Sequence, residues 1–512
     1  MRQMHEKNQP LKMIIKVSSQ NKFPSKNVFV PLFQAELPSL QKDVLFYLPP
    51  DIQKIALDFA RKNFRGEEGE IKYIWLSSKK IERITFLGLG ERNKWNTAKS
   101  QMAARRAAGF AKNEKMEDFS FYLREEFGEN YKESSKIFAL NFLLADFEFS
   151  RYKKPSAKAK PVKNVFLCST EENLKDLKQG SEEGKIIGEE TNGCRALANS
   201  PGGDITPVGL AQEARLVALK NKISVKILDE KDMKKIGMGG VLGVSKGSSE
   251  KPRFIIMEYR GVNPPAGGPP LALVGKGVTF DTGGLNLKPE QGIYEMHMDM
   301  SGGAAVIHGL AAIARLKLPL NVVGLVPAVE NSTSGSSYRP GDILKSLSGK
   351  TIEVLNTDAE GRIILADALT YSLRWKPGFI LDIATLTGAA MVALGNHCSA
   401  LFTNRDKLQK KLFEIGKDSG DKVWPLPLWE EYGEEIKGTF ADIANVGKVR
   451  WGGAIHGAKF LESFTENTPW AHLDIAPKMT TNDAEALTKG ASGAGVRYIV
   501  ELAKRYEEII NV

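Results

Sequence analysis

The sequence predicts an α/β protein with two domains: a smaller N-terminal α/β domain, and a larger C-terminal α/β domain with a central mixed sheet flanked by helices. Its 512 residues exceed the length of one typical domain, and an apolar content of 42% can fill two cores. Short β-branched segments alternate with stretches whose apolar residues recur at helical spacing. No constellation of chemically active side chains is visible before residue 270. We therefore expect the chemistry in the second domain.

The domain boundaries follow from a charged helical stretch. Residues 171–198 have a helical pattern that ends at Asn199-Ser200-Pro201-Gly202-Gly203, where Pro and Gly stop a helix. We assign residues 1–170 to the N-terminal domain, 171–199 to a linker helix and 200–512 to the C-terminal domain. In the N-terminal domain the pattern predicts a helix at 97–112 and strands at 12–17, 44–48, 83–87 and 165–168.

The segment NTDAEGR at residues 356–362 places two carboxylates and a guanidinium between an expected strand and an expected helix. Residues 351–355 alternate as a half-buried strand does, and residues 363–375 carry apolar side chains at helical spacing. Ligands of open α/β sheets bind beyond the carboxyl ends of strands, and a helix that begins near Arg362 adds its positive dipole end. The segment predicts a metal cluster beside a small-anion pocket. Taken on its own, such a segment would be better explained as an exposed loop with a helix-starting acid and a surface arginine.

A second cluster favours the metal site. The apolar strand expected at 271–281 is interrupted by Lys276 and ends in Asp281, and Asp299 precedes a small-residue helix that runs to residue 316. Violations of strand pattern of this kind tend to occur at functional sites. A regular strand would point Lys276 and Asp281 to opposite faces, so we expect a bulge or twist at 275–277 that brings both to one site. Taken alone, Lys276 is typical of an edge lysine that reaches water.

These segments closely resemble the leucyl (cytosol) aminopeptidases, two-metal exopeptidases whose hallmark is NTDAEGR. The resemblance extends over residues 190–505 and includes YRPGD at 338–342, DIATLTGA at 382–389 and WAHLDIA at 470–476. A match of this length is far more specific than a single short motif. It implies a metal-dependent hydrolase that releases N-terminal amino acids from peptides, with a macro-like N-terminal domain and a catalytic C-terminal domain.

The resemblance also implies two divalent metal ions, Zn²⁺ or Mn²⁺. Carried over by position, one metal is held by Lys276, Asp281, Asp299 and Glu360, and the other by Asp281, Asp358 and Glu360. Two nearby dications repel each other, and four carboxylates supply the charge that offsets this repulsion. A lysine ligand must be neutral, so its pKa must fall well below the roughly 10.4 of a free side chain, as neighbouring dications would cause. None of the six histidines lies in an HExxH pattern, which excludes the common single-zinc protease site.

The mechanism that the resemblance implies is attack on the scissile carbonyl by a water that bridges the metals. One metal binds the free α-amine of the substrate, which explains why only the first residue is removed. Lys288 stays protonated and stabilises the developing oxyanion. Arg362 holds a bicarbonate that acts as general base, and a helix N-terminus suits an anion independently. Capture of phosphate or carboxylate from solvent remains an alternative for Arg362.

Substrate specificity is implied more loosely. The resemblance places five residues around the pocket for the first side chain, with part of the wall near Ala491 and Ser492; the five are Met296, Asn356, Thr385, Leu386 and Gly388. A methionine beside small residues suits apolar side chains, so leucine is the expected preference. Without the family, Met296 is equally well explained by core packing.

Composition and segment patterns agree with a cytoplasmic enzyme. The three cysteines, Cys168, Cys194 and Cys398, are odd in number and widely spaced, which fits a reducing compartment. No run of 18 apolar residues is present, and residues 1–20 carry charges where a signal peptide needs an apolar stretch. We expect no membrane partner. The resemblance implies a homohexamer, a dimer of trimers.

Positive charge is concentrated near the N-terminus. Residues 1–170 hold 31 Lys+Arg against 19 Asp+Glu, so the whole excess of +10 lies there. The densest run, residues 151–161, contains Pro and Ala and is expected to be an exposed loop. DNA binding is the alternative function that this charge suggests, and some members of the resembled family do bind DNA. A solvated surface is the commoner explanation, because the run lacks stacking aromatic residues between its charges.

Overall fold

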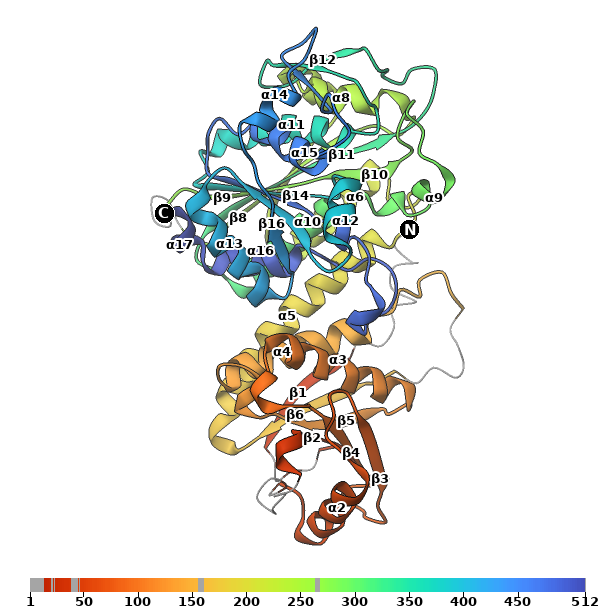
Figure 1. Cartoon of the computed structure of the whole chain (residues 1–512), viewed down its shortest axis with the longest axis vertical. Coiled ribbons are helices and arrows are strands. Elements are labelled where there is room, and N and C mark those ends of the chain that lie inside the picture. The colour runs from red at the N-terminus through yellow and green to blue at the C-terminus, as the bar shows by residue number, and fades with distance from the viewer. Residues whose placement is uncertain are drawn as a thin grey trace. The chain divides into compact units, whose positions relative to one another are not determined.

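The computed structural model describes residues 13–19, 22, 24–37, 45, 47–154, 161–262 and 268–511. The chain divides into two compact units, one of residues 1–189 with 483–488 and one of residues 190–482 with 489–512. Each unit is a mixed α/β structure with helices against its sheet, which confirms the predicted fold class (Figure 1). Residues 174–198 form one helix, α5 (Leu174–Ala198), and the division between the units falls inside it.

The unit of residues 1–189 contains, among its described residues, a six-stranded sheet of order β1-β6-β5-β2-β4-β3. All neighbouring strands are parallel except β3 and β4. One face packs on α3 and α4 and the other on α2, each through a separate apolar cluster. The bounds are β1 Ile14–Ser19, β2 Asn27–Leu32, β3 Ile71–Trp75, β4 Arg83–Gly88, β5 Asp118–Tyr122, β6 Asn164–Ser169, α2 Pro50–Asn63, α3 Thr97–Asn113 and α4 Tyr131–Asp146.

Most elements predicted for this unit are present. The helix at 97–112 corresponds to α3, whose first turn is capped by Asn96 accepting a hydrogen bond from the Lys99 amide. The strands at 83–87 and 165–168 correspond to β4 and β6, and β1 covers the described part of the strand at 12–17. Residues 155–160 of the predicted basic loop lie outside the described residues.

The strand predicted at 44–48 is wrong at the residues described there, 45, 47 and 48, which form turns before α2. Pro49 and Pro50 explain the error, because proline cannot donate to a sheet ladder and suits the first turn of a helix. Leu45 and Leu48 are nevertheless buried, in the cluster beneath α2. These residues are apolar because they pack in this cluster, and not because they form a strand.

The unit of residues 190–482 and 489–512 is built on a nine-stranded mixed sheet of order β16-β15-β18-β14-β9-β11-β8-β7, in which β10 also pairs with β11. Strands β12, β13 and β17 form a separate three-stranded sheet, which among the described residues is not hydrogen-bonded to the large one. The strands are β7 Ser224–Leu228, β8 Arg253–Arg260, β9 Leu271–Gly275, β10 Gly277–Asp281, β11 Asn321–Asn331, β12 Ile343–Lys345, β13 Thr351–Glu353, β14 Phe379–Ala384, β15 Ser399–Thr403, β16 Val423–Pro425, β17 Ile443–Ala444 and β18 Trp470–Asp474.

Helices cover both faces of the large sheet, as the alternation of apolar stretches predicts. One face packs on α6 Pro207–Asn221, α10 Ser301–Leu316, α13 Asp406–Ser419 and α16 Val496–Lys504. The other packs on α7 Glu230–Ile236, α8 Gly239–Val244, α11 Glu360–Ser372, α12 Gly388–Leu394 and α15 Gly453–Glu462. The shorter helices α9 Glu290–Ile293, α14 Glu431–Glu435 and α17 Tyr506–Ile510 complete the set. None of the helices searched in the described residues is long and apolar enough to cross a membrane.

The strand expected at 271–281 is interrupted at Lys276, where β9 ends and β10 begins. The backbone of Lys276 stays paired, donating to the Ile383 carbonyl at 3.0 Å and accepting from the Gly303 amide at 2.7 Å. A second irregularity shifts the β10–β11 register between Val278 and Phe280. A Cβ on Gly302 would lie 2.0 Å from the Ile383 carbonyl oxygen, so glycine there lets α10 begin against the strand backbone. The predicted break is therefore present, and it lies against the start of α10.

Candidate metal centre

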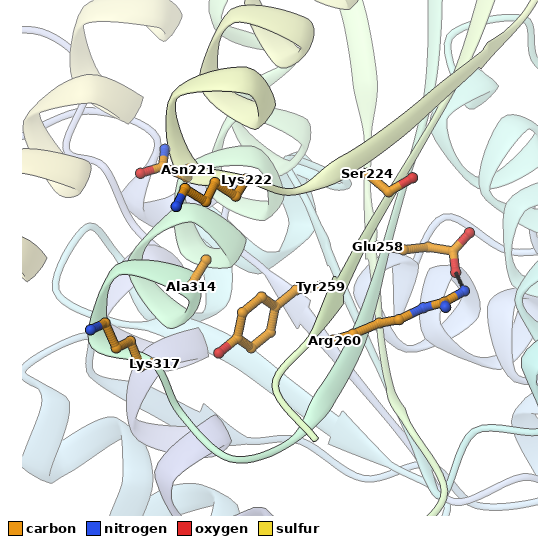
Figure 2. Close-up of a pocket in the computed structure, with 8 residues that line it drawn as sticks. All are labelled: Asn221, Lys222, Ser224, Glu258, Tyr259, Arg260, Ala314 and Lys317. Atoms are coloured by element: carbon orange, nitrogen blue, oxygen red, sulfur yellow. Dashed lines mark ion pairs between the residues drawn. The ribbon is translucent and has the colours of Figure 1, made fainter. Parts of the chain in front are cut away.

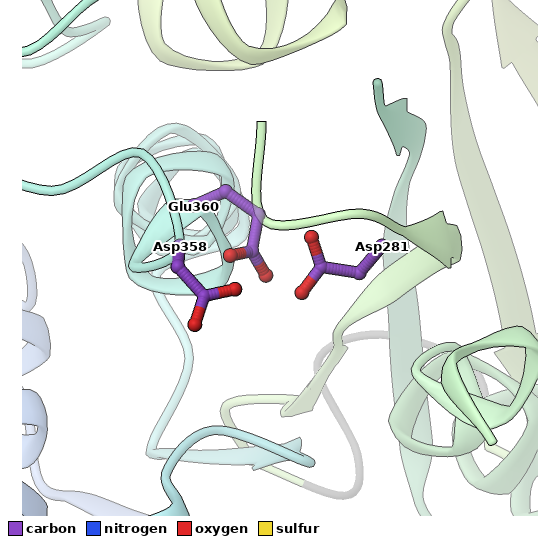
Figure 3. A group of neighbouring side chains, drawn as sticks. All are labelled: Asp281, Asp358 and Glu360. Carbon is purple, nitrogen blue, oxygen red and sulfur yellow. The ribbon is translucent and has the colours of Figure 1, made fainter. Parts of the chain in front are cut away.

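Three carboxylates converge where β10 ends and α11 begins (Figure 3). Asp281 is the last residue of β10, Asp358 lies in the turn after β13, and Glu360 is the first residue of α11. One oxygen from each lies within 4.8 Å of the others. Asp281 and Glu360 are buried, whereas the side chain of Asp358 is 33% exposed. The group is therefore inside the fold but open on one side.

Two lysines and a fourth carboxylate complete the cluster. The Lys276 Nζ lies 2.8 Å from Asp299 Oδ2 and 2.8 Å from Glu360 Oε1, and it donates to the Thr385 carbonyl at 2.9 Å. The Lys288 Nζ lies 2.8 Å from Asp281 Oδ2 and also pairs with Asp358. The structure thus brings together the five ligand residues expected from the sequence, and Lys288 with them.

Negative charge is in excess in this cluster, since four carboxylates face two lysines. Burial, with the neighbouring Asp281 charge, raises the pKa of Glu360 to about 8 and that of Asp358 above its ordinary value. Burial raises the pKa of Asp299 to about 6 even though Lys276 lowers it. For Lys276 and Lys288, burial acts to lower the pKa, but the surrounding carboxylates hold it above the ordinary value. The cluster therefore favours additional positive charge.

The donor set fits divalent cations. Asp299 Oδ2, Asp358 Oδ1 and Glu360 Oε1 are buried and accept no well-oriented hydrogen bond from the described residues, although each has a lysine Nζ nearby. Buried carboxylate oxygens with free lone pairs are uncommon in proteins and are the usual ligands of hard cations. A lysine nitrogen among them suits a metal that also accepts nitrogen, such as zinc or manganese.

Side chains that the sequence did not single out hold these loops in place. The Asn331 amide, at the end of β11, donates to Asp281 Oδ1 and to the Thr357 carbonyl. The Thr357 hydroxyl donates to the Gly283 carbonyl at 2.7 Å, and the Tyr338 hydroxyl donates to the Thr357 carbonyl at 2.7 Å. Asn331 is the last residue of the long, largely apolar strand β11, so an amide at a strand end was the available signal.

Arg362 lies in the first turn of α11 and is buried. Its Nη1 donates to the Asn445 carbonyl at 2.8 Å, and its Nε has no hydrogen-bond partner among the described residues. Burial lowers the pKa of Arg362 to about 10. A Cβ on Gly457 would lie 3.4 Å from Nη2, so this glycine leaves room beside the guanidinium. A buried cation with an unused donor at a helix N-terminus suits a small anion.

The five expected pocket residues lie on segments next to the ligands. Thr385 is buried and donates to Asp299 Oδ1 at 2.6 Å, while Asn356 Oδ1 accepts from the Asp358 amide at 2.8 Å. The Leu386 amide donates to Asp474 Oδ1 at 3.0 Å. Met296 is half-buried in a turn of 3-10 helix, and Gly388 is exposed at the start of α12. Thr385 and Asn356 thus contact two of the expected ligands, Asp299 and Asp358, directly.

A separate cavity of about 580 Å³ shares no residue with this cluster (Figure 2). It lies beside strands β7 and β8 and contains Tyr259, whose hydroxyl donates to the Leu318 carbonyl at 3.1 Å. Lys222 and Lys317 at its edge occupy left-handed positions that end α6 and α10, where a cation is favourable. The two lysines are thus accounted for as helix caps, and the other two charged side chains, Glu258 and Arg260 of β8, pair with each other at 3.9 Å. We therefore place the chemistry at the carboxylate cluster.

Comparison with known proteins agrees with this geometry. Residues 192–500 match the model of the cytosol aminopeptidase family, catalytic domain, and residues 54–156 match that of the cytosol aminopeptidase family, N-terminal domain. The probable cytosol aminopeptidase of Roseiflexus castenholzii is 41% identical over 83% of this chain and 88% of its own length. That of Chlorobium phaeobacteroides is 37% identical over 97% of this chain and 100% of its own. The bottromycin maturation enzyme BotP in complex with Mn superimposes with a TM-score of 0.81 at 28% identity, over 94% of this chain and 99% of BotP.

Proposed function

The chain belongs to the cytosol aminopeptidase family, whose members are hydrolases that remove N-terminal residues, and we propose that it is a two-metal leucyl aminopeptidase. The observation that carries the proposal is the buried cluster of four carboxylates and two lysines beside the end of β10 and the start of α11. Its excess of negative charge, and its buried oxygens that accept no well-oriented hydrogen bond from the described residues, suit cations rather than a purely structural role.

Zn²⁺ or Mn²⁺ are the proposed metals, and the bound Mn of BotP supports the second. Lys276, Asp281, Asp299 and Glu360 would hold one ion, and Asp281, Asp358 and Glu360 the other. Two such ions would supply a water nucleophile of lowered pKa and polarise the scissile carbonyl. The ligand role of Lys276 requires that the cations displace the proton that the carboxylates otherwise hold on its amine.

Lys288 is proposed to stabilise the oxyanion that develops on the scissile carbonyl. Its ammonium lies 2.8 Å from Asp281, which places its positive charge beside the proposed metal ligands. Arg362 is proposed to bind a bicarbonate that accepts a proton from the attacking water. The unpartnered Nε and the start of α11 support anion binding there. Both residues act through charge placed in advance at a buried site.

The substrates are proposed to be peptides with a free N-terminus and an apolar first residue, leucine above all. Asn356 and Thr385 contact ligand residues, so a side chain seated beside them lies next to the scissile bond. The half-buried thioether of Met296 suits an apolar group. Leu386 and Gly388 are proposed to complete the pocket.

The location and the oligomeric state of the protein are also proposals. A cytoplasmic location is supported by the naming of the relatives as cytosol aminopeptidases. A homohexamer, a dimer of trimers, is supported only by the family resemblance. The DNA-binding alternative receives no support from the described residues, and part of the basic run on which it rested lies outside them.

Hydrolysis of leucine p-nitroanilide by the purified full chain tests the proposal, before and after chelation and with zinc, manganese and magnesium added back separately. We expect chelation to abolish release and zinc or manganese to restore it. A peptide with an acetylated N-terminus should not be cleaved. Release that survives complete removal of metal, or cleavage of the acetylated peptide, would contradict the proposed function.

A further inference from the structure

We propose that Asn331 is a positioning residue of the metal centre: its side-chain amide ties Asp281 to the turn that carries Asp358 and leads into Glu360 at the start of α11. The inference rests on the proposed two-metal function and adds to it a residue outside the expected ligand set. Asn331 touches neither substrate nor metal in this role. It acts by fixing which carboxylate oxygen faces the centre and how far apart the ligand-bearing segments lie.

The position of Asn331 in the sheet makes this link possible. Asn331 is the last residue of β11, is fully buried, and is paired in register with Asp281 at the end of β10. Its Nδ2 donates to Asp281 Oδ1 at 2.8 Å and to the Thr357 carbonyl oxygen at 2.9 Å. One amide group therefore joins the large sheet to the residue that precedes Asp358.

Only an amide of this orientation satisfies both partners. Both contacted atoms are acceptors, and the NH₂ group supplies two donors. The opposite orientation would place a carbonyl oxygen against a carboxylate and a carbonyl, which is repulsive. An aspartate or leucine of similar size provides no donor at this position. The site therefore requires asparagine for a chemical reason rather than for its volume.

The link also decides which oxygen of Asp281 is available. Asp281 Oδ1 accepts from Asn331 Nδ2 at 2.8 Å and from the Gly283 amide at 2.9 Å, which occupies its two lone pairs. Asp281 Oδ2 instead faces the Lys288 Nζ at 2.8 Å. Oδ2 is thus the oxygen left for a cation. Without Asn331 the carboxylate could rotate, and its charge would no longer be presented in one direction.

The other end of the link is held equally firmly. The Thr357 carbonyl accepts from both Asn331 and the Tyr338 hydroxyl, and the Thr357 amide donates to Asn286 Oδ1 at 2.8 Å. The backbone immediately before Asp358 is therefore fixed on both sides. Partners that orient metal ligands commonly change metal affinity by about 10- to 100-fold when they are removed.

The test compares Asn331→Leu, which keeps volume but removes both donors, with Asn141→Leu. Asn141 is a buried asparagine of the other unit, bonded to Arg105 and to the Ile137 carbonyl, and it provides the matched control. Dissociation constants for Mn²⁺ alone are measured by competition with a chelator, and the visible absorption of the Co²⁺-substituted protein reports ligand geometry. Asn331→Ala serves if the leucine variant does not fold.

We expect the Asn331 variants to bind Mn²⁺ about 10- to 100-fold more weakly and to show an altered Co²⁺ spectrum. The Asn141 variant should lose stability but keep the metal affinity and spectrum of the unmodified chain. Unchanged Mn²⁺ affinity and an unchanged Co²⁺ spectrum in a folded Asn331 variant would overturn the inference while leaving the proposed function intact. Failure of the unmodified chain to bind any of the metals would overturn both.

Discussion

Two of the buried groups of charged side chains in the unit of residues 190–482 and 489–512 differ in their charge balance. In the first, Glu190 Oε1 pairs with Arg315 at 2.7 Å and Oε2 with His308 at 2.8 Å. Each carboxylate oxygen has a partner. Burial acts to raise the pKa of Glu190, but His308 and Arg315 lower it to about 2. This group joins α5 to α10 and is satisfied by its own members.

In the second group, the candidate metal centre, the carboxylates outnumber their cationic partners. Four carboxylates share two lysines, the pKa values of Asp299, Asp358 and Glu360 are raised, and three buried oxygens lack well-oriented hydrogen bonds. The difference shows how a buried cluster of charged side chains that stabilises the fold can be distinguished from one that is suited to bind a ligand. In the balanced cluster the partner charges lower the pKa of the carboxyl, whereas in the unbalanced one the pKa values of three carboxyls are raised and the excess negative charge suits a bound cation.

Among the substitutions that test the difference between the two groups, Asp358→Ala has the largest expected effect, a loss of activity. The substitution removes a proposed metal ligand, so kcat/KM for leucine p-nitroanilide should fall by at least about 10³-fold. It also removes one negative charge from a cluster with an excess, so the melting temperature of the metal-free protein should not fall. Activity assays and thermal melts with and without Mn²⁺ measure both effects. Near-normal turnover would exclude Asp358 from the metal site.

Local sequence pattern singled out part of the metal centre, and the resemblance to the cytosol aminopeptidases implied the ligand set and the role of Lys288. Lys276 interrupts an apolar strand and Asp281 ends it, and the break at this position exists in the structure. Asp358 stands between a strand and a helix, as expected, whereas Glu360 is the first residue of that helix, α11, which begins two residues before the expected start near Arg362. The strand, β13, belongs to the small sheet rather than the large one. Strand pairing depends on contacts distant in sequence, so local pattern could not assign it.

The supporting residues could not be found in this way. Asn331 is an ordinary polar residue at a strand end and Thr357 is one in a turn. Their importance comes from the groups that they meet in three dimensions, Asp281 and the Thr357 carbonyl for Asn331 and the Gly283 carbonyl for Thr357. The balanced cluster was missed for the same reason, because Glu190 and His308 are far apart in sequence and both lie within helices. A sequence pattern can indicate where a single helix or strand departs from its usual spacing of apolar residues. It does not predict which side chains of different elements contact each other.

Lys288→Met tests the electrostatic half of the proposal. The variant keeps most of the side-chain stem but removes the charge that is proposed to stabilise the oxyanion, so kcat should fall by about 10²- to 10³-fold. The loss of a cation makes the cluster more negative, so Mn²⁺ content should be retained. Steady-state kinetics and metal analysis of the same preparation distinguish the roles. Loss of metal together with activity would make Lys288 part of the binding site instead.

Glu190→Gln should produce the smallest effect and one confined to stability. Its pKa is lowered from 4.5 to about 2 in the folded protein, so between these values the unfolded chain binds more protons than the folded one. The stabilisation by Glu190 is therefore complete above pH 4.5 and is lost as the pH falls through 2. A shift of this size corresponds to about 3 kcal/mol as an upper limit for this largely buried side chain.

Urea unfolding of the metal-free proteins at several pH values between 7 and 3 measures this effect. The difference in unfolding free energy between the unmodified chain and Glu190→Gln should be greatest above pH 4.5 and shrink as the pH is lowered. Mn²⁺ affinity and kcat of the folded variant should match those of the unmodified chain, because Glu190 contacts His308 and Arg315 and no member of the metal centre. A pH-independent difference would mean that the cluster stabilises by packing rather than by charge. A change in metal affinity would mean that the two clusters are coupled, and the distinction between balanced and unbalanced charge would no longer separate structure from function.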